Sequence, residues 1–128
     1  MTELFIYGTL RRGGSNHFRM EGAEFVGGGR IAGRIYKIDW YPALVCDGAG
    51  EVKGELYRVS EEHLLALDVF EGIVPEEGES CGYRRVKVEV TLDSGEKESA
   101  WAWEWIGDLS SALALDKGDW LGYEPNPS

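Results

Sequence analysis

The alternation of apolar and polar residues is clearest in the last third of the chain. Residues 83–92 place apolar side chains on one face, which predicts a strand, and the valines and leucine on that face are Val86, Val88, Val90 and Leu92. The Asp-Ser-Gly sequence at 93–95 is typical of a hairpin turn. Residues 99–106 then return as a second strand, with one face formed by Trp101, Trp103 and Trp105. We interpret this tryptophan stripe as core, because such stripes pack inside a protein more often than they stack on a ligand.

Further strands are expected earlier in the chain. The apolar run at 4–7 predicts a short buried strand, and residues 51–60 predict another. Residues 25–48 are rich in β-branched side chains and interrupted by glycines, so we expect two strands with a bend. Residues 15–22 could form one helical turn or a loop, and residues 73–82 are expected to form a polar loop.

Residues 60–72 give the clearest helical signal. Ser60 suits the N-cap, and Glu61 and Glu62 suit the positive end of the helix dipole in the first turn. Gly72 suits the stop. We therefore expect one main helix between the strand at 51–60 and the hairpin.

One stripe of this helix combines leucines with carboxylates. Leu64, Leu67, Asp68 and Glu71 recur at helical spacing, and the leucines indicate that the stripe faces inward. Glu71 would then lie where the helix meets the interior, although a frayed helix end would leave it in water. A buried carboxyl group beside Asp68 would have a raised pKa, which suits a general base.

The number of strands, the single helix and the length indicate one α+β domain over residues 1–128, with a small barrel-like mixed β-sheet and a C-terminal hairpin. The chain has 18 glycines in 128 residues, about twice the usual share, which favours a turn-rich β architecture. The last residues, 118–128, are expected to form an irregular tail.

The net charge of −10 argues against binding to nucleic acid or to an anionic membrane surface. The Arg11-Arg12 pair is a local exception, and we interpret it as part of a solvated loop. Cys46 and Cys81 are expected to be reduced and partly buried. No apolar run reaches the length of a membrane span, so we expect a cytoplasmic protein.

Three motif interpretations are disfavoured. Residues 27–32 formally match the dinucleotide fingerprint G-x-G-x-x-A, but the residues that follow favour a strand where pyrophosphate needs a helix N-terminus. A G-x-S-x-G nucleophile elbow is absent. The histidines and cysteines share no metal-ligand spacing, so no metal site is expected from His17, His63, Cys46 and Cys81.

Five segments, taken in order, resemble the γ-glutamylcyclotransferase-like superfamily, and its γ-glutamylamine cyclotransferase branch most closely. They are YGTLRRGGSN, WYPAL, VKGELYRV, LDVFEG and YRRVKVEV, within a stretch from Leu4 to Trp105. The resemblance implies a small-molecule γ-glutamyl substrate whose own α-amine attacks the γ-carbonyl. The products would be 5-oxoproline and a free amine or amino acid, and the reaction would need no cofactor or metal.

The resemblance also implies the site residues. Glu71 would be the catalytic base, and the turn at Tyr7, Gly8, Thr9 and Leu10 would hold the glutamyl end of the substrate through backbone groups. Tyr83 and Arg85 match the Y-x-R pattern of the family, and Arg85 could equally bind a carboxylate or make a structural ion pair.

Two features bear on specificity. Trp103 stands about where the family commonly has a tyrosine. If that tyrosine hydroxyl orients the substrate in the family, the substrate preference of the family does not carry over directly to this chain. The acidic segment 75–79 would favour a cationic leaving amine if it lies beside the site. A larger γ-glutamyl-protected product is another possible substrate. The alternative function is a non-catalytic module that binds a small ligand or peptide, and the sequence gives no prediction of oligomeric state.

Overall fold

The computed structural model describes residues 2–14, 16–38, 41–46, 48, 50–70, 83–107, 109–110 and 112–115. In chain order, its elements are β1 (Thr2–Ile6), a 3₁₀ turn η1 (His17–Met20), β2 (Glu24–Ala32), β3 (Arg34–Ile38), β4 (Tyr41–Val45), β5 (Glu51–Val59), α1 (Glu61–Phe70), β6 (Tyr83–Leu92), β7 (Lys97–Trp105) and β8 (Leu113–Leu115).

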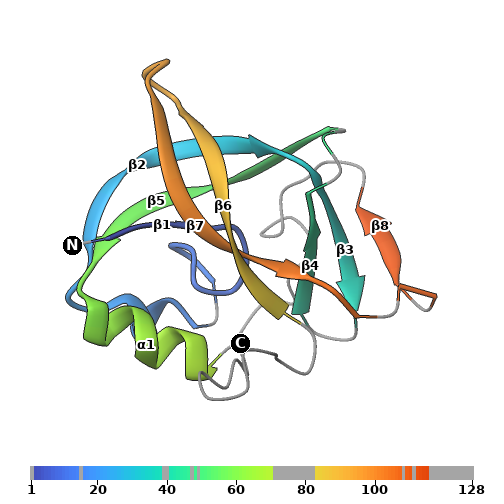
Figure 1. The fold of residues 1–128 in the computed structure, drawn as a ribbon, viewed down its shortest axis with the longest axis horizontal. Helices are drawn as coiled ribbons and strands as arrows, with labels where there is room; N and C mark the ends of the chain where they lie inside the picture. Colours follow the sequence, from blue (N-terminus) through green and yellow to red (C-terminus); the bar gives the residue numbers. More distant parts are fainter. Residues whose placement is uncertain are drawn as a thin grey trace.

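Five strands close into a barrel in the order β1-β5-β2-β6-β7 (Figure 1). Neighbouring strands are antiparallel, except that β1 and β7 pair in parallel at Leu4 and Trp101. The α1 helix lies outside the barrel beside the N-terminal end of β1 (Figure 1). The prediction of a small barrel-like mixed sheet with one main helix and a hairpin is confirmed.

A second, three-stranded sheet has the order β4-β3-β8. The segment 25–48 therefore contains three strands, β2, β3 and β4, and the prediction of two was wrong. Gly33 separates β2 from β3 at φ +152°, where the backbone of β4 lies so close that a Cβ would be 2.9 Å from the Val45 carbonyl oxygen. Strand β4 lies at the sheet edge, which is where a strand tolerates Pro42.

Residues 27–32 lie within β2, and an irregularity in the pairing with β5 falls between Phe25 and Gly27. The interpretation of these glycines as part of a curved sheet, and not as a dinucleotide fingerprint, is confirmed. Strand β8 was not predicted, because three residues are too few to show a periodic pattern.

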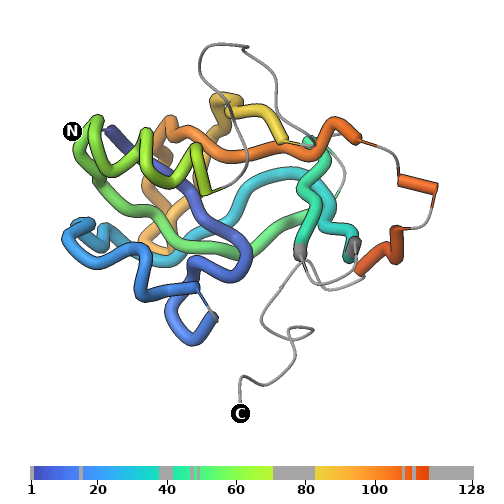
Figure 2. The backbone as a smooth tube through the Cα atoms, turned by 90° about the horizontal axis from the view of Figure 1, so that it is seen from below, coloured from blue at the N-terminus to red at the C-terminus, as the bar shows by residue number. Residues whose placement is uncertain are grey.

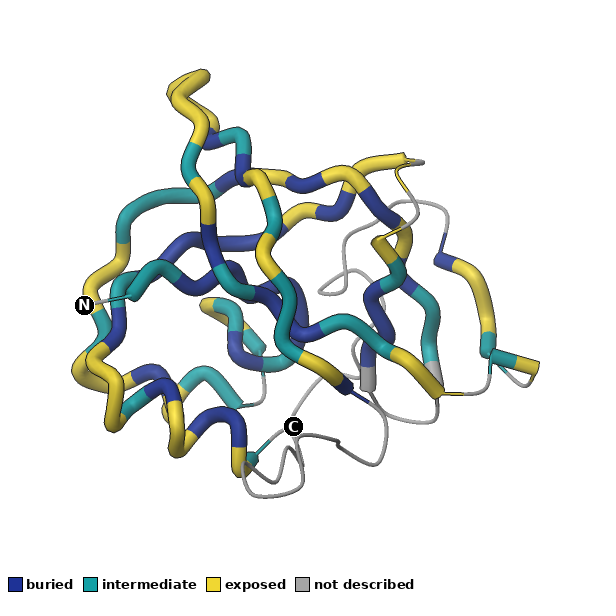
Figure 3. Tube along the Cα trace, viewed as in Figure 1, coloured by how far each residue is buried: buried dark blue, intermediate teal, exposed yellow. Residues whose placement is uncertain are grey.

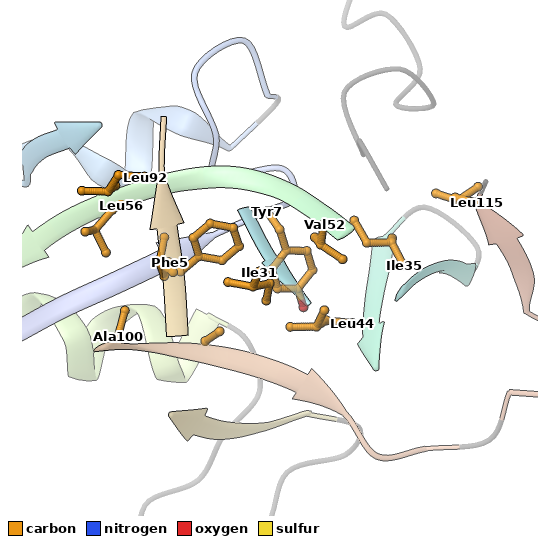
Figure 4. Close-up of a cluster of buried hydrophobic side chains, with 12 residues drawn as sticks. Phe5, Tyr7, Ile31, Ile35, Leu44, Val52, Leu56, Leu92, Ala100 and Leu115 are labelled. Carbon is orange, nitrogen blue, oxygen red and sulfur yellow. The ribbon is translucent and has the colours of Figure 1, made fainter. Parts of the chain in front are cut away.

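Two hydrophobic clusters hold the fold together. The inner cluster runs from the barrel interior into the small sheet (Figure 4). It is formed by Phe5, Tyr7, Ile31, Ile35, Leu44, Val52, Leu56, Val90, Leu92, Ala100, Ala102 and Leu115. The outer cluster joins the barrel wall to the layer of α1 and the β1–β2 connection, and it is formed by Leu4, Ile6, Leu10, Met20, Tyr57, Val59, Leu64, Leu67, Tyr83 and Trp103.

The predicted local signals of the helix and the hairpin are present. The Ser60 hydroxyl accepts a hydrogen bond from the His63 N–H at 3.1 Å, as an N-cap does. Gly95 adopts φ +95° in the hairpin turn, whose tip is exposed (Figure 3). Gly72 and the tail at 118–128 lie outside the described residues.

The tryptophan stripe is core, as predicted, but it packs outside the barrel. Trp103 is 2% exposed in the outer cluster, and Trp101 and Trp105 are partly buried against the same cluster. Cys46 is exposed, so the expectation of partial burial was wrong for this cysteine, and Cys81 lies outside the described residues. Over the described part of the chain, no helix has the length and apolar character needed to cross a membrane.

Strand β5 can approach β1 this closely only because residue 54 is glycine. A Cβ on Gly54 would lie 2.5 Å from Phe5 Cζ and still closer to the Ile6 carbonyl oxygen. We expect Gly54→Ala to lower the free energy of unfolding by about 2 kcal/mol or more, as overpacking does. Urea unfolding measures this difference.

The matched control is Gly27→Ala in the neighbouring strand. Its Cβ would meet only Leu92 Cδ2, at an ordinary 3.8 Å, so we expect a change within about 0.5 kcal/mol. Equal stability of the two variants would contradict the close approach of β5 to β1.

Candidate active site

In the turn after β1, the backbone carbonyl groups accept hydrogen bonds from residues that follow shortly afterwards in the chain. The Gly8 carbonyl accepts from the Arg11 N–H at 3.1 Å, and the Thr9 carbonyl accepts from the Asn16 N–H at 2.9 Å. The Leu10 carbonyl accepts from Nδ1 of His17 at 2.9 Å, which requires the proton to be on that nitrogen. The carbonyl groups of Gly8, Thr9 and Leu10 therefore all have partners.

The N–H groups of the same three residues do not. Among the residues that the structure describes, the N–H groups of Gly8, Thr9 and Leu10 donate no hydrogen bond. Gly8 and Leu10 are buried and Thr9 is half-buried. Adjacent unpaired donors in a turn form an anion-binding concavity, and leaving them without a partner is costly. The turn can therefore hold a carboxylate or a developing oxyanion.

Glycine at position 8 is required by the close approach of β4. A Cβ on Gly8 would lie 2.5 Å from Pro42 Cγ. The preceding residue, Tyr7, points its ring into the inner cluster, and its hydroxyl donates to the Trp103 carbonyl at 2.5 Å (Figure 4). Tyr7 therefore anchors the start of the turn to β7, and only its backbone is available to a ligand.

The Y-x-R pattern on β6 lies on the face that carries the tryptophan stripe. Tyr83 pairs with Trp105 and Arg85 pairs with Trp103 in the register of β6 and β7. The Tyr83 hydroxyl donates a hydrogen bond to the Pro42 carbonyl. The structure thus brings two predicted site residues, Gly8 and Tyr83, into contact with the same proline.

Arg85 makes the structural ion pair that was one of its two expected roles. Its Nη1 is 3.5 Å from Asp68 Oδ2, and its guanidinium lies over the Trp101 ring at 4.9 Å. Asp68 also accepts from the Trp103 indole N–H at 2.8 Å. Because 29% of the Arg85 side chain stays exposed, the ion pair leaves room for a second role.

Glu71, the predicted base, lies outside the described residues. The described helix ends one residue before it, at Phe70, and its last turn is tied to the barrel through Asp68. Asp68 is 3% exposed, so this carboxylate belongs to the inward face of α1, as the stripe of leucines and carboxylates predicted.

Glu55 on β5 was not among the residues predicted from the sequence. This carboxylate is 8% exposed, and its Oε1 accepts from the Arg12 N–H at 2.9 Å and from the Tyr57 hydroxyl at 3.1 Å. Its Oε2 lies 3.8 Å from Arg11 Nε, and the Arg11 side chain is only 12% exposed. The interpretation of the arginine pair as a solvated loop was therefore wrong for Arg11. No local signal marks Glu55, because a charge in an alternating strand normally faces water.

Tyr57 shows the electrostatic effect of this arrangement. Burial, and then the negative charge of Glu55, raise the pKa of Tyr57 from 10.0 to about 12. The rings of Phe25 and His17 flank the Tyr57 ring, with centroid distances of 5.3 and 6.4 Å. The rings of both described histidines lie within hydrogen-bond distance of backbone carbonyls. His17 Nδ1 contacts the Leu10 oxygen, and His63 Nε2 lies 2.8 Å from the Arg19 oxygen.

A family model for gamma-glutamyl cyclotransferase, AIG2-like, matches residues 4–122. The chain therefore belongs to this family. The expected superfamily is confirmed, and the narrower γ-glutamylamine branch stays a prediction.

Individual relatives agree with this assignment. A Vibrio cholerae protein with a provisional gamma-glutamylcyclotransferase name is 33% identical over 121 residues, which are 91% of this chain and 93% of that protein. A Niallia circulans protein named gamma-L-glutamyl-butirosin B gamma-glutamyl cyclotransferase is 30% identical over 125 residues, 96% of this chain and 78% of that protein. An aig2-like protein from Mus musculus has the same fold, with a TM-score of 0.80, 24% identity and coverage of 100% of this chain and 97% of that chain.

The raised pKa of Tyr57 predicts a pH-dependent contribution to stability. The folded protein holds the phenol proton more tightly than the unfolded chain does, so this contribution is complete below about pH 10 and is lost as the pH rises through about 12. The difference in unfolding free energy between the wild type and Tyr57→Phe should therefore shrink over that range. Urea unfolding from neutral to alkaline pH measures it.

An ultraviolet titration of the tyrosines provides the control. Tyr57→Phe should remove one phenol that titrates well above the ordinary range. A titration curve that keeps its most alkaline step in the variant would contradict the assignment.

Proposed function

We propose that this protein is a γ-glutamyl cyclotransferase that releases 5-oxoproline and a free amine or amino acid from a γ-glutamyl amine or a small γ-glutamyl peptide. One observation carries the proposal. The three N–H groups of Gly8, Thr9 and Leu10 donate no hydrogen bond within the described structure, in a turn whose carbonyls are all occupied. Membership of the family gives that anion-binding turn its substrate class.

The reaction needs a base and a fixed conformation. The substrate α-amine is an ammonium at neutral pH, and Glu71 takes its proton so that the nitrogen can attack the γ-carbonyl carbon. The new carbon–nitrogen bond closes a five-membered ring, and the attacking nitrogen releases its second proton to solvent. Glu71 returns the first proton to the leaving nitrogen as the old carbon–nitrogen bond breaks, and the free amine takes up one proton from solvent. Because nucleophile and electrophile belong to one molecule, the protein mainly has to hold the ring-closing conformer.

The N–H groups of the turn are well suited to the anionic parts of this reaction. They can bind the substrate α-carboxylate or stabilise the oxyanion that develops on the γ-carbonyl oxygen. Arg85 is a second candidate for the carboxylate, since its guanidinium remains partly exposed beside Asp68. Tyr83 would act from the edge of the site, because its hydroxyl already donates to Pro42.

Two observations bear on the identity of the leaving group. If it lies beside the site, the acidic segment 75–79 would favour a cationic amine, such as the ε-amine of lysine, over an anionic peptide such as the one released from glutathione. The name of the Niallia circulans relative points instead to a larger γ-glutamylated product, γ-L-glutamyl-butirosin B. We place γ-glutamyl-ε-lysine first and test the larger compound beside it.

The test is release of 5-oxoproline from γ-glutamyl-ε-lysine, γ-glutamylalanine, glutathione and γ-L-glutamyl-butirosin B. We expect the wild type to turn over at least one of them, and Glu71→Gln to lower kcat by about 100-fold or more, the usual effect of removing a general base. Glu62→Gln makes the same change of charge at an exposed position in the first turn of α1 and should keep wild-type activity.

Two results would argue against the proposal. Wild-type rates in Glu71→Gln would remove the base from the mechanism while leaving the reaction intact. No 5-oxoproline from any substrate would favour the alternative, a non-catalytic module that binds a small ligand or peptide.

A further inference from the structure

Glu55 is a buried charge that the proposed reaction does not use. It lies on β5 opposite Ile6 of β1 and Gly28 of β2, and its side chain points away from the barrel interior. An outward-facing glutamate would ordinarily be solvated, but here the β1–β2 connection covers it and leaves 8% of the residue exposed. Burying a carboxylate is unfavourable unless its oxygens accept hydrogen bonds or pair with a cation. The residues that do so indicate which part of the chain the buried Glu55 holds in place.

The donors come mainly from the residues that follow the anion-binding turn. One oxygen accepts the Arg12 N–H at 2.9 Å, and the other faces Arg11 Nε at 3.8 Å. These two residues come directly after Leu10 in the chain. A further donor, the Tyr57 hydroxyl, lies on β5 itself and donates to the first oxygen at 3.1 Å.

The start of the turn is tied to β7 through the Tyr7 hydroxyl, which donates to the Trp103 carbonyl. The bonds of its carbonyls to Arg11, Asn16 and His17 are internal to the β1–β2 connection. Leu10 packs in the outer cluster, but apolar contact is non-directional, so it buries the turn without setting its orientation. The Glu55 carboxylate supplies direction, because one oxygen accepts a hydrogen bond from the Arg12 N–H and the other lies within ion-pair distance of Arg11 Nε.

We propose that Glu55 is a positioning residue that holds the N–H groups of Gly8, Thr9 and Leu10 at the place where they bind the anionic part of the substrate. This inference rests on the proposed function and adds the residue on which its binding turn depends. Stability alone is a weaker explanation, because a buried ion pair is often replaceable by apolar residues without loss.

Glu55→Gln is a sharp test because it keeps the size of the side chain. An amide has one acceptor oxygen and no charge, whereas one oxygen of the carboxylate accepts the Arg12 N–H and the other pairs electrostatically with Arg11. Either orientation of the glutamine therefore places its NH₂ group against a donor of the loop. We expect the turn to shift and kcat/KM for 5-oxoproline release to fall by about 10- to 100-fold, as small misplacements in active sites do.

Two matched variants separate positioning from stability. Val90→Ala removes a fully buried side chain of the inner cluster on β6, away from the loop, and should destabilise the protein with little change in kcat/KM. Tyr57→Phe removes the donor that does not belong to the loop and should have a much smaller effect on kcat/KM than Glu55→Gln.

A structural readout accompanies the kinetics. Amide NMR spectra of Glu55→Gln should show changed shifts at Arg12 and at residues 8–10, while the amides of the β6–β7 hairpin keep their wild-type shifts. This measurement remains informative if Glu55→Gln is less stable, because it reports only on the folded molecules.

Each outcome is decisive. An active wild type with a slow, folded Glu55→Gln and a normal Val90→Ala supports the inference. An active wild type whose Glu55→Gln loses no more kcat/KM than Val90→Ala overturns the positioning role and leaves the proposed function standing. A wild type that releases no 5-oxoproline from any substrate overturns the proposed function, and this role with it.

Discussion

Burial of β1 on both faces is the constraint on which the rest of the structure depends. Alternate residues of this strand enter different clusters, with Phe5 inside the barrel and Leu4 and Ile6 beneath the outer layer, and Tyr7 directly after the strand joins Phe5. A strand buried on both sides must have sheet neighbours and a cover. Strands β5 and β7 provide the neighbours, and α1 with the β1–β2 connection provides the cover, as the view in Figure 2 shows. The chain therefore leaves β1 in a crowded interior, where residue 8 lies so close to Pro42 that only glycine fits.

The covering layer is joined to the barrel by two buried carboxylates as well as by apolar contact. Asp68 connects α1 to β6 and β7, through Arg85 and the Trp103 indole. Glu55 connects the β1–β2 connection to β5, through Arg12 and Arg11. Hydrophobic burial holds helix and loop on the barrel without defining their orientation, whereas these contacts are directional. The two elements held in this way are the β1–β2 connection, which carries the proposed binding turn, and α1, which ends one residue before Glu71, the proposed base.

The proposed reaction would need only a small number of groups. An intramolecular reaction needs no second substrate site, so a turn that binds an anion and one base can suffice. Preference for the leaving group would depend on further residues, which would include the acidic segment 75–79 if it lies beside the site.

By itself, the sequence determined the elements that depend on near neighbours in the chain. The alternation along 83–105, the hairpin turn at Gly95 and the N-cap at Ser60 are set by residues within a few positions of one another, and they match the structure. The ordered family segments identified the superfamily and, as a proposal, the role of Glu71. Tertiary structure alone decided which charges are buried and which faces are covered. Glu55 has the pattern of a solvated residue until a loop 43 positions away folds over it. The tryptophan stripe is buried on the outside of the barrel because α1 packs over it. Strand β8 is defined only by its pairing with the edge of β3. Such contacts depend on segments that are distant in the chain, and no local pattern records them.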